Sequence, residues 1–175
     1  MTNAELRELN RSRRIHQIAW VTRDLEKSMQ AWVDNLRIGP WQVLTFTNET
    51  ADYLKIDGKD VTEPFKFLVG ITWLGDIQLE LIQPVYGPPA YQDHLDRKGP
   101  GLHHIKEYIP DEATEATLAS YREKGIAVTQ TGKFDADYHY YLDTEPKLDF
   151  IMELGNCPVL DLPPEMYTTF PPEES

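Results

Sequence analysis

The sequence holds a single cysteine, Cys157, among its 175 residues. One cysteine excludes an internal disulfide and a cysteine-based zinc cluster, and it is typical of a reducing compartment. No apolar run approaches the roughly 20 residues that cross a bilayer, and residues 1–14 are charged throughout, with no apolar segment that a secretory signal would use. We therefore expect a cytoplasmic protein with no membrane partner.

Basic residues are also scarce. Lysine and arginine number 17 against 29 acidic residues, which gives a formal net charge of -12. Such a charge repels phosphate backbones, so we expect no nucleic-acid partner. The remaining composition, 41% hydrophobic and 26% charged, is that of an ordinary globular chain. At this length it can bury one substantial core or form two small fused modules.

The central part of the chain repeats itself in pattern. Residues 16–39 (HQIAWVTRDLEKSMQAWVDNLRIG) match residues 103–126 (HHIKEYIPDEATEATLASYREKGI) at an offset of 87. In both copies a polar pair followed by isoleucine opens a short predicted strand. An aspartate seven residues after the second member of the pair, Asp24 or Asp111, is well placed to cap a helix. Each copy therefore begins with a strand and continues as a helix.

The back halves of the two copies correspond at an offset of 73. LGDIQLEL (74–81) matches LDFIMEL (148–154) when Glu80 is laid over Glu153, and both segments read as strands. Further strand-like segments precede each of them. The sequence thus predicts an α+β fold in which two tandem βαβββ modules form a curved mixed sheet around a cleft.

These patterns also predict how the chain is divided. The long segment 46–64 is expected to form a loop over the cleft, and the prolines near the C-terminus indicate extended chain with little independent structure. The expected parts are an N-terminal helical arm (1–13), a first module (14–86), a linker (87–100), a second module (101–156) and an extended tail (157–175).

The repeat also predicts a metal site. Side chains alternate across a strand, so one polar residue of each first strand can share the inner face with the glutamate of each last strand. A pseudo-twofold axis between the modules would bring Gln17, Glu80, His104 and Glu153 together. Two carboxylates balance one divalent ion, while an imidazole and an amide oxygen complete the shell. This donor set suits zinc, cobalt, nickel or manganese, and suits iron less well.

Four motifs carry a family resemblance. HQIAWVTRDLEKSMQAW, GDIQLELIQP, GPGLHHI and DTEPKLDFIMEL resemble those of the vicinal oxygen chelate superfamily, which includes glyoxalases, bleomycin-resistance proteins and dioxygenases, over residues 14–156. GPGLHHI and the flanking stretches are similar to methylmalonyl-CoA epimerase, whereas the set Gln, Glu, His, Glu resembles that of eukaryotic glyoxalase I. The resemblance implies paired βαβββ modules, one divalent metal ion, and proton transfer next to a carbonyl through a metal-stabilised enolate.

The resemblance also implies catalytic roles. In glyoxalase I the glutamate at the position of Glu153 is the base, so Glu153 is the first candidate here, and Glu80 could act on the opposite face. In the epimerases a further glutamate lies on the strand before the ligand strand. Glu63 is the nearest acid in this chain, but it is one residue out of step, which would turn its side chain to the other face.

Three further residues are candidates for substrate binding. Lys106 follows His104 by two residues and so shares its face, where it could bind an anionic group. Trp73 and Tyr108 are candidates for an aromatic wall. His16 and His103, next to the proposed ligands, are expected to face away because side chains alternate along a strand.

The sequence therefore predicts a metal-dependent isomerase, epimerase or lyase for a small carbonyl or thioester substrate, and the resemblance implies a homodimer. One alternative is a metal-free ligand-binding protein of the resistance type. A ring-cleaving dioxygenase is a further alternative, but it needs two histidines on iron, and His16 could replace Gln17 only through a register shift. No recognisable set for binding CoA or glutathione is present.

Overall fold

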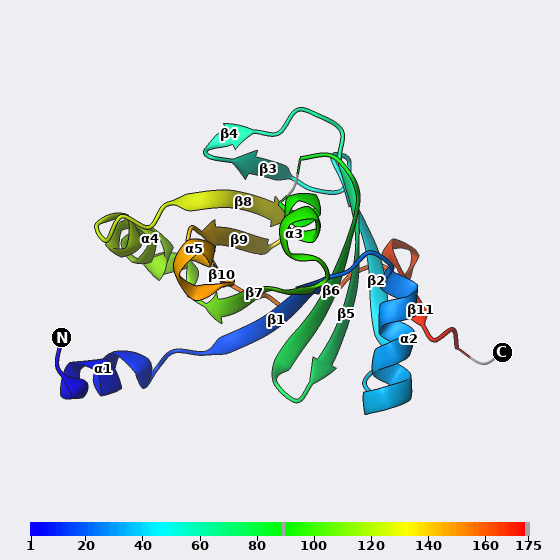
Figure 1. Ribbon diagram of the computed structural model, residues 1–175, viewed down its shortest axis with the longest axis horizontal. Helices are drawn as coiled ribbons and strands as arrows, with labels where there is room; N and C mark the ends of the chain where they lie inside the picture. Colours follow the sequence, from blue (N-terminus) through cyan, green and yellow to red (C-terminus); the bar gives the residue numbers. More distant parts are fainter. Residues whose placement is uncertain (89, 174–175) are drawn as a thin grey trace.

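The computed structural model describes residues 1–88 and 90–173, and its strands join into one strongly curved sheet (Figure 1). The sheet has eleven strands in the order β11-β2-β5-β6-β1-β7-β10-β9-β8-β3-β4, with parallel and antiparallel pairs. The predicted α+β class with a curved mixed sheet is therefore confirmed.

The elements follow the predicted repeat. The first copy contains β1 (Ile15–Val21), α2 (Leu25–Leu36), β2 (Trp41–Thr47), β3 (Tyr53–Ile56), β4 (Lys59–Asp60), β5 (Lys66–Leu74) and β6 (Ile77–Tyr86). The second contains β7 (Gly101–Tyr108), the 3-10 turn η1 (Asp111–Ala113), α4 (Thr114–Arg122), β8 (Val128–Phe134), β9 (Asp137–Leu142), α5 (Glu145–Leu148) and β10 (Ile151–Gly155). Outside the copies lie α1 (Asn3–Asn10), α3 (Tyr91–Lys98), η2 (Pro164–Met166) and β11 (Tyr167–Phe170).

A local twofold axis relates the two copies. Strands β1 and β7 join them as an antiparallel pair in which Ile18 lies opposite Ile105, its own counterpart in the repeat. The parallel pairings on either side also correspond. Gln17 pairs with Gln78 and Ala19 with Glu80 in the first copy, and His104 pairs with Ile151 and Lys106 with Glu153 in the second. Equivalent positions therefore meet around the β1–β7 pair.

Helix α2 begins where the sequence indicated. The Asp24 carboxylate accepts a hydrogen bond from the backbone N–H of Lys27 at 3.0 Å, and Leu25 and Met29 are buried against the sheet. The second copy differs, because Asp111 lies inside the turn η1 and helix α4 starts only at Thr114. No helix in the described residues is long and apolar enough to cross a membrane.

The segment expected to be a loop over the cleft forms a hairpin instead. Strand β3 pairs with β8 of the second copy, with Tyr53 opposite Lys133, although β2 belongs to the other half of the sheet. Because only a short link joins β2 to β3, the two halves must curl toward each other. The rings of Phe46 and Phe134 then meet with their centroids 4.8 Å apart. The curl turns the sheet into the wall of a cavity.

The tail also joins the sheet. Strand β11 pairs antiparallel with β2, with Phe170 opposite Trp41, so it forms one edge of the sheet. The prolines on either side of β11 predicted only extended chain, and the ladder with β2 is a tertiary contact that the sequence pattern does not carry.

Two bulges interrupt the β1–β7 pair at the polar dipeptides. The register shifts between Ile15 and Gln17 on β1, so His16 is an extra residue there, and it shifts again where Ala19 faces His104 and Trp20 faces Leu102. The extra residue at the second shift is His103. A bulge breaks the alternation of side chains, so the strand period alone cannot predict which way these histidines point.

Candidate metal centre

The four predicted ligands meet around one nitrogen. His104 Nε2 lies 2.8 Å from Glu153 Oε2, 3.2 Å from Gln17 Oε1 and 3.3 Å from Glu80 Oε2. The side chains come from β7, β10, β1 and β6, the four central strands related by the local twofold. His104, Glu153 and Gln17 are buried, whereas Glu80 retains some exposure to the cavity. The structure thus brings the predicted set together.

Neighbouring side chains fix how two of these groups are turned. Gln17 Nε2 donates to Gln78 Oε1 at 2.5 Å, which directs the amide oxygen of Gln17 toward His104. On the other side, His104 Nδ1 lies 2.9 Å from Nδ1 of the buried His103, so Nε2 is the nitrogen that faces the cluster. Such outer contacts commonly orient metal ligands.

Lys106, which the sequence suggested as a partner for an anionic group of the substrate, is already paired within the protein. Its ammonium is buried and lies 2.9 Å from Asp137 Oδ1 and 3.1 Å from Glu153 Oε1. Burial alone would lower the pKa of Lys106, but the two carboxylates outweigh it and raise the pKa, so the ammonium stays charged. Gly155 makes room for it, because a Cβ at that position would lie 2.5 Å from the Lys106 Cε.

Neighbouring charges shift the pKa values of Glu153 and His104 in opposite directions. Burial would raise the pKa of Glu153, but Lys106 and His104 outweigh it and hold that pKa far below its usual range. Its two oxygens are each held by a different cation. For His104, burial would lower the pKa, yet the charges and hydrogen bonds of Glu153 and Glu80 raise it to about 9.

The chemical types of the donors suit a divalent ion. In this structure, however, Glu153, Gln17 and Glu80 are in hydrogen-bonding or ion-pair contact with His104 Nε2. Within the described residues, no group of three or more His, Cys, Asp or Glu side chains forms a ready metal cage. Ligand atoms that bind cis to one ion at 2.0–2.1 Å lie about 3 Å apart, close to the 2.8 to 3.3 Å that separates His104 Nε2 from its three neighbours. Those separations would suit ligands that share one ion, and binding would require the Nε2 proton to leave.

The cluster lies in the wall of a cavity of about 180 Å³ formed inside the curled sheet. Trp73 lines this cavity, as predicted. Tyr108 and Glu63 are not among the described residues that line it, because Tyr108 lies at the exposed end of β7 and Glu63 precedes β5. The carboxylates among the described lining residues are Glu80, Asp137 and Glu153, so Glu63 does not supply the additional glutamate that the resemblance to the epimerases implied.

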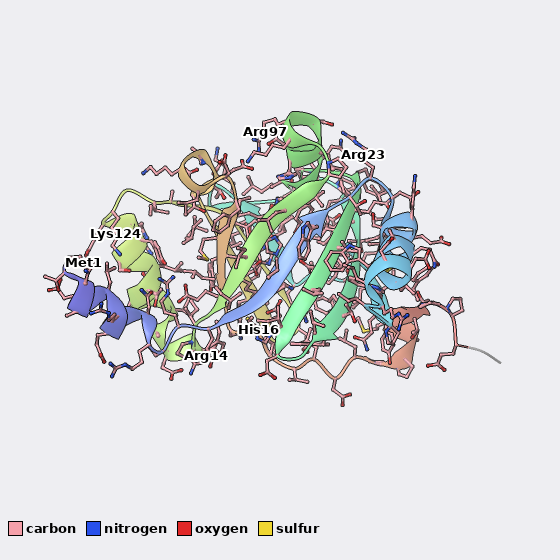
Figure 2. All side chains as sticks on the ribbon, turned by 60° about the horizontal axis from the view of Figure 1, so that its bottom comes forward. Met1, Arg14, His16, Arg23, Arg97 and Lys124 are labelled. Carbon is pink, nitrogen blue, oxygen red and sulfur yellow. The ribbon has the colours of Figure 1, made fainter. Side chains whose placement is uncertain are left out.

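His16 lines the cavity together with Gln17, which corrects the expectation that it faces away. The β1 bulge places both side chains on the cavity side, and the His16 ring packs edge-on against Trp73 at 5.4 Å. In Figure 2 His16 is labelled on β1, the blue strand in the middle of the sheet. By contrast, His103 is not among the described residues that line the cavity; it is buried behind His104 and packs with Tyr91 of α3.

Sequence reasoning missed two residues of the site. Gln78 precedes Glu80 by two positions, so strand alternation could have placed it on the same face. Asp137 begins β9 directly after a turn, and nothing in its sequence context marks it as a partner of Lys106.

Comparisons with known proteins agree with this fold. A family model described as the glyoxalase/bleomycin resistance protein/dioxygenase superfamily matches residues 16–141. No curated protein matches the chain by sequence.

Several solved structures are similar in fold. A hypothetical protein from Bacillus halodurans has a TM-score of 0.65 and 12% identity, and the match covers 87% of this chain and 99% of that one. A Streptomyces coelicolor methylmalonyl-CoA epimerase variant in complex with 2-nitronate-propionyl-CoA has a TM-score of 0.57, 19% identity, and coverage of 86% and 98%. The Mycobacterium tuberculosis methylmalonyl-CoA epimerase has a TM-score of 0.54, 14% identity, and coverage of 81% and 85%. At these identities the similarity shows the fold alone.

Proposed function

Since the chain belongs to the glyoxalase/bleomycin resistance protein/dioxygenase superfamily, we propose that it is a metal-dependent isomerase, epimerase or lyase that moves a proton on the carbon next to a carbonyl group. The observation that supports this proposal best is the meeting of Gln17, Glu80, His104 and Glu153 at one wall of a cavity. A divalent ion held by these residues would act as a Lewis acid toward a carbonyl oxygen and so acidify the neighbouring C–H.

We assign the proton transfer to Glu80 rather than to Glu153. The two glutamates are equivalent in the repeat, but their strand neighbours differ, because Ala19 stands beside Glu80 where Lys106 stands beside Glu153. Glu153 is held on both oxygens and its pKa is strongly lowered, which makes it a weak base.

The exposure of the two carboxylates supports the same division. The Glu80 side chain is 14% exposed and that of Glu153 is 3% exposed. In the described part of the chain, no lysine or arginine forms an ion pair with Glu80. Glu153 would then hold the ion and the shape of the site, while Glu80 exchanges the proton with substrate.

Exchange of the substrate α-proton in deuterium oxide tests this function. With one divalent ion per chain, the protein is expected to exchange the α-proton of an enolisable carbonyl compound. Removal of the ion with a chelator is expected to stop the exchange, and its return should restore it. If the metal-loaded protein leaves every α-proton in place across a panel of such compounds, the proposed function is wrong.

One observation favours a second candidate, a metal-free ligand-binding protein. As the cluster stands, His104 is satisfied by hydrogen bonds to carboxylates, so no ion is needed to keep it buried. The metal content of the purified protein separates the two functions. A stoichiometric transition metal supports the enzyme, and its absence after incubation with zinc, cobalt, nickel and manganese supports the binding protein.

Metal affinity is expected to rise with pH. The pKa of His104 is raised to about 9, so below that pH a bound proton must leave before Nε2 can act as a ligand. Between pH 6 and pH 8 the apparent association constant should therefore increase by about tenfold for each pH unit. Titration with Co²⁺, followed by its visible spectrum, measures this. An affinity that does not change over the range would exclude His104 Nε2 as a ligand.

Gln78 is expected to support the metal through Gln17. Gln78→Leu removes the acceptor that orients the Gln17 amide, and loss of such a contact commonly lowers metal affinity by about 10- to 100-fold. The matched control is Gln42→Leu, which replaces another amide that lines the same cavity. Direct titration of metal into both variants measures the difference, and equal affinities would show that the Gln17 amide needs no such support.

A further inference from the structure

Away from the ligand cluster, one part of the cavity wall is apolar. Phe46 of β2 and Phe67 of β5 stack with ring centroids 5.1 Å apart, and Phe134 of β8 packs its edge against Phe46 at 4.8 Å. Ile71 continues the same face of β5 and lies opposite Glu80 in the neighbouring strand. A molecule that reaches Glu80 therefore has its body against aromatic and aliphatic side chains.

The tail adds to these walls. Between the end of β10 and the start of η2, the chain passes along the cavity and contributes Pro158, Val159, Leu160 and Leu162 to its lining. Because β11 then pairs with β2, this segment is anchored at both ends by strands of the sheet. The cavity is thus bordered by apolar groups on the tail side as well.

Free positive charge is scarce in this cavity. Lys106 and Lys133 are the cationic lysine and arginine side chains among the described lining residues. Lys106 is held by Asp137 and Glu153, while Lys133 Nζ lies 3.4 Å from the Asp52 carboxylate. The phosphates of a CoA thioester require several arginine or lysine partners, and with a net charge of -12 the chain repels them further.

We propose that the cavity binds an uncharged carbonyl compound whose body is an apolar ring system, and that it does not bind a CoA thioester. The inference rests on the proposed function, since the carbonyl would lie at the ligand cluster beside Glu80. Offset and edge-on contacts with Phe46 and Phe67 favour a ring over an open chain.

Titration calorimetry with three probes tests this substrate class on the full chain, both loaded with metal and stripped of it. The probes are 1-indanone as a neutral aryl ketone, 2-butanone as its open-chain counterpart and propionyl-CoA as the phosphate-bearing thioester. We expect 1-indanone to bind about tenfold or more tightly than 2-butanone. Propionyl-CoA is expected to give no saturable binding at the same concentrations.

Variants show whether the aromatic wall is responsible. Phe67→Ala is expected to weaken 1-indanone binding by about tenfold. Phe134→Leu keeps an apolar side chain, disturbs the packing less and should weaken 1-indanone binding several-fold. This variant replaces Phe67→Ala in the test if Phe67→Ala does not fold. Lys55→Met, which removes a partly exposed ion pair with Asp60 outside the described cavity lining, is the control and should leave 1-indanone binding unchanged.

Tighter binding of propionyl-CoA than of 1-indanone would overturn the inference, and so would unchanged 1-indanone binding in the phenylalanine variants. Failure of the proposed function gives a different result. In that case the α-proton is not exchanged, yet 1-indanone still binds and still depends on Phe67 and Phe134. Glu80→Gln should reproduce this second pattern, because it alters the base and leaves the aromatic wall intact.

Discussion

Glu80→Gln is expected to lower the rate of α-proton exchange by about 10²- to 10⁴-fold, the usual contribution of a general base. The amide can no longer accept a proton from carbon, but its oxygen can still occupy the position of the carboxylate oxygen near His104. One divalent ion per chain should therefore remain bound, with weaker affinity. The measurement pairs metal analysis with proton exchange followed by NMR in deuterium oxide.

Glu153→Gln is the matched comparison, because the same chemical change is made at the equivalent position of the repeat. It removes the carboxylate that lies between His104 and Lys106, so its main effect should be on metal retention and folding. If Glu153→Gln keeps the ion and loses exchange while Glu80→Gln keeps both, the roles of the two glutamates are reversed.

The second large effect is expected at Lys106. Lys106→Met leaves the buried Glu153 carboxylate and Asp137 without their ammonium partner. Breaking a buried ion pair from one side typically costs about 3–5 kcal/mol of unfolding free energy, because a charge remains buried without compensation. Urea unfolding of the metal-free protein at neutral pH should show the midpoint shifted strongly downward.

Two controls make the Lys106 result specific. Lys133→Met removes the partly exposed pair with Asp52 and should change the unfolding free energy by about 0–1 kcal/mol. Adding Asp137→Leu to Lys106→Met removes one of the stranded charges and should recover part of the loss. Similar unfolding midpoints for the Lys106 and Lys133 variants would mean that the buried ion pairs contribute little to stability.

The pairing of positions in the repeat was readable from the sequence. The sequence offsets align Gln17 with His104 and Glu80 with Glu153. The first offset also aligns Ile18 with Ile105, and these two counterparts lie opposite each other in the β1–β7 pair. A duplicated hydrophobic pattern specifies two similar folds, and their shared sheet brings equivalent positions together.

The surroundings of those positions could not be read in the same way. Strand alternation assigned His16 to the outer side, but a bulge on β1 turns it into the cavity. Lys106 was expected to bind an anionic group, yet its ammonium is buried against Asp137 from β9, in space that the missing side chain of Gly155 leaves open. Each of these contacts joins residues whose relation is set by neighbouring strands, and periodicity along one strand carries no information about them.

The sequence by itself therefore determined the fold class, the internal repeat and which four side chains would converge. Only the tertiary structure decided that the sheet curls into a cavity, because this requires β3 to leave its own half and pair with β8. It also decided that Glu153 is ion-paired on both oxygens, whereas Glu80 remains partly exposed to the cavity. The physical reason is that a repeat fixes positions through local periodicity, whereas charge and access depend on contacts between residues far apart in the chain.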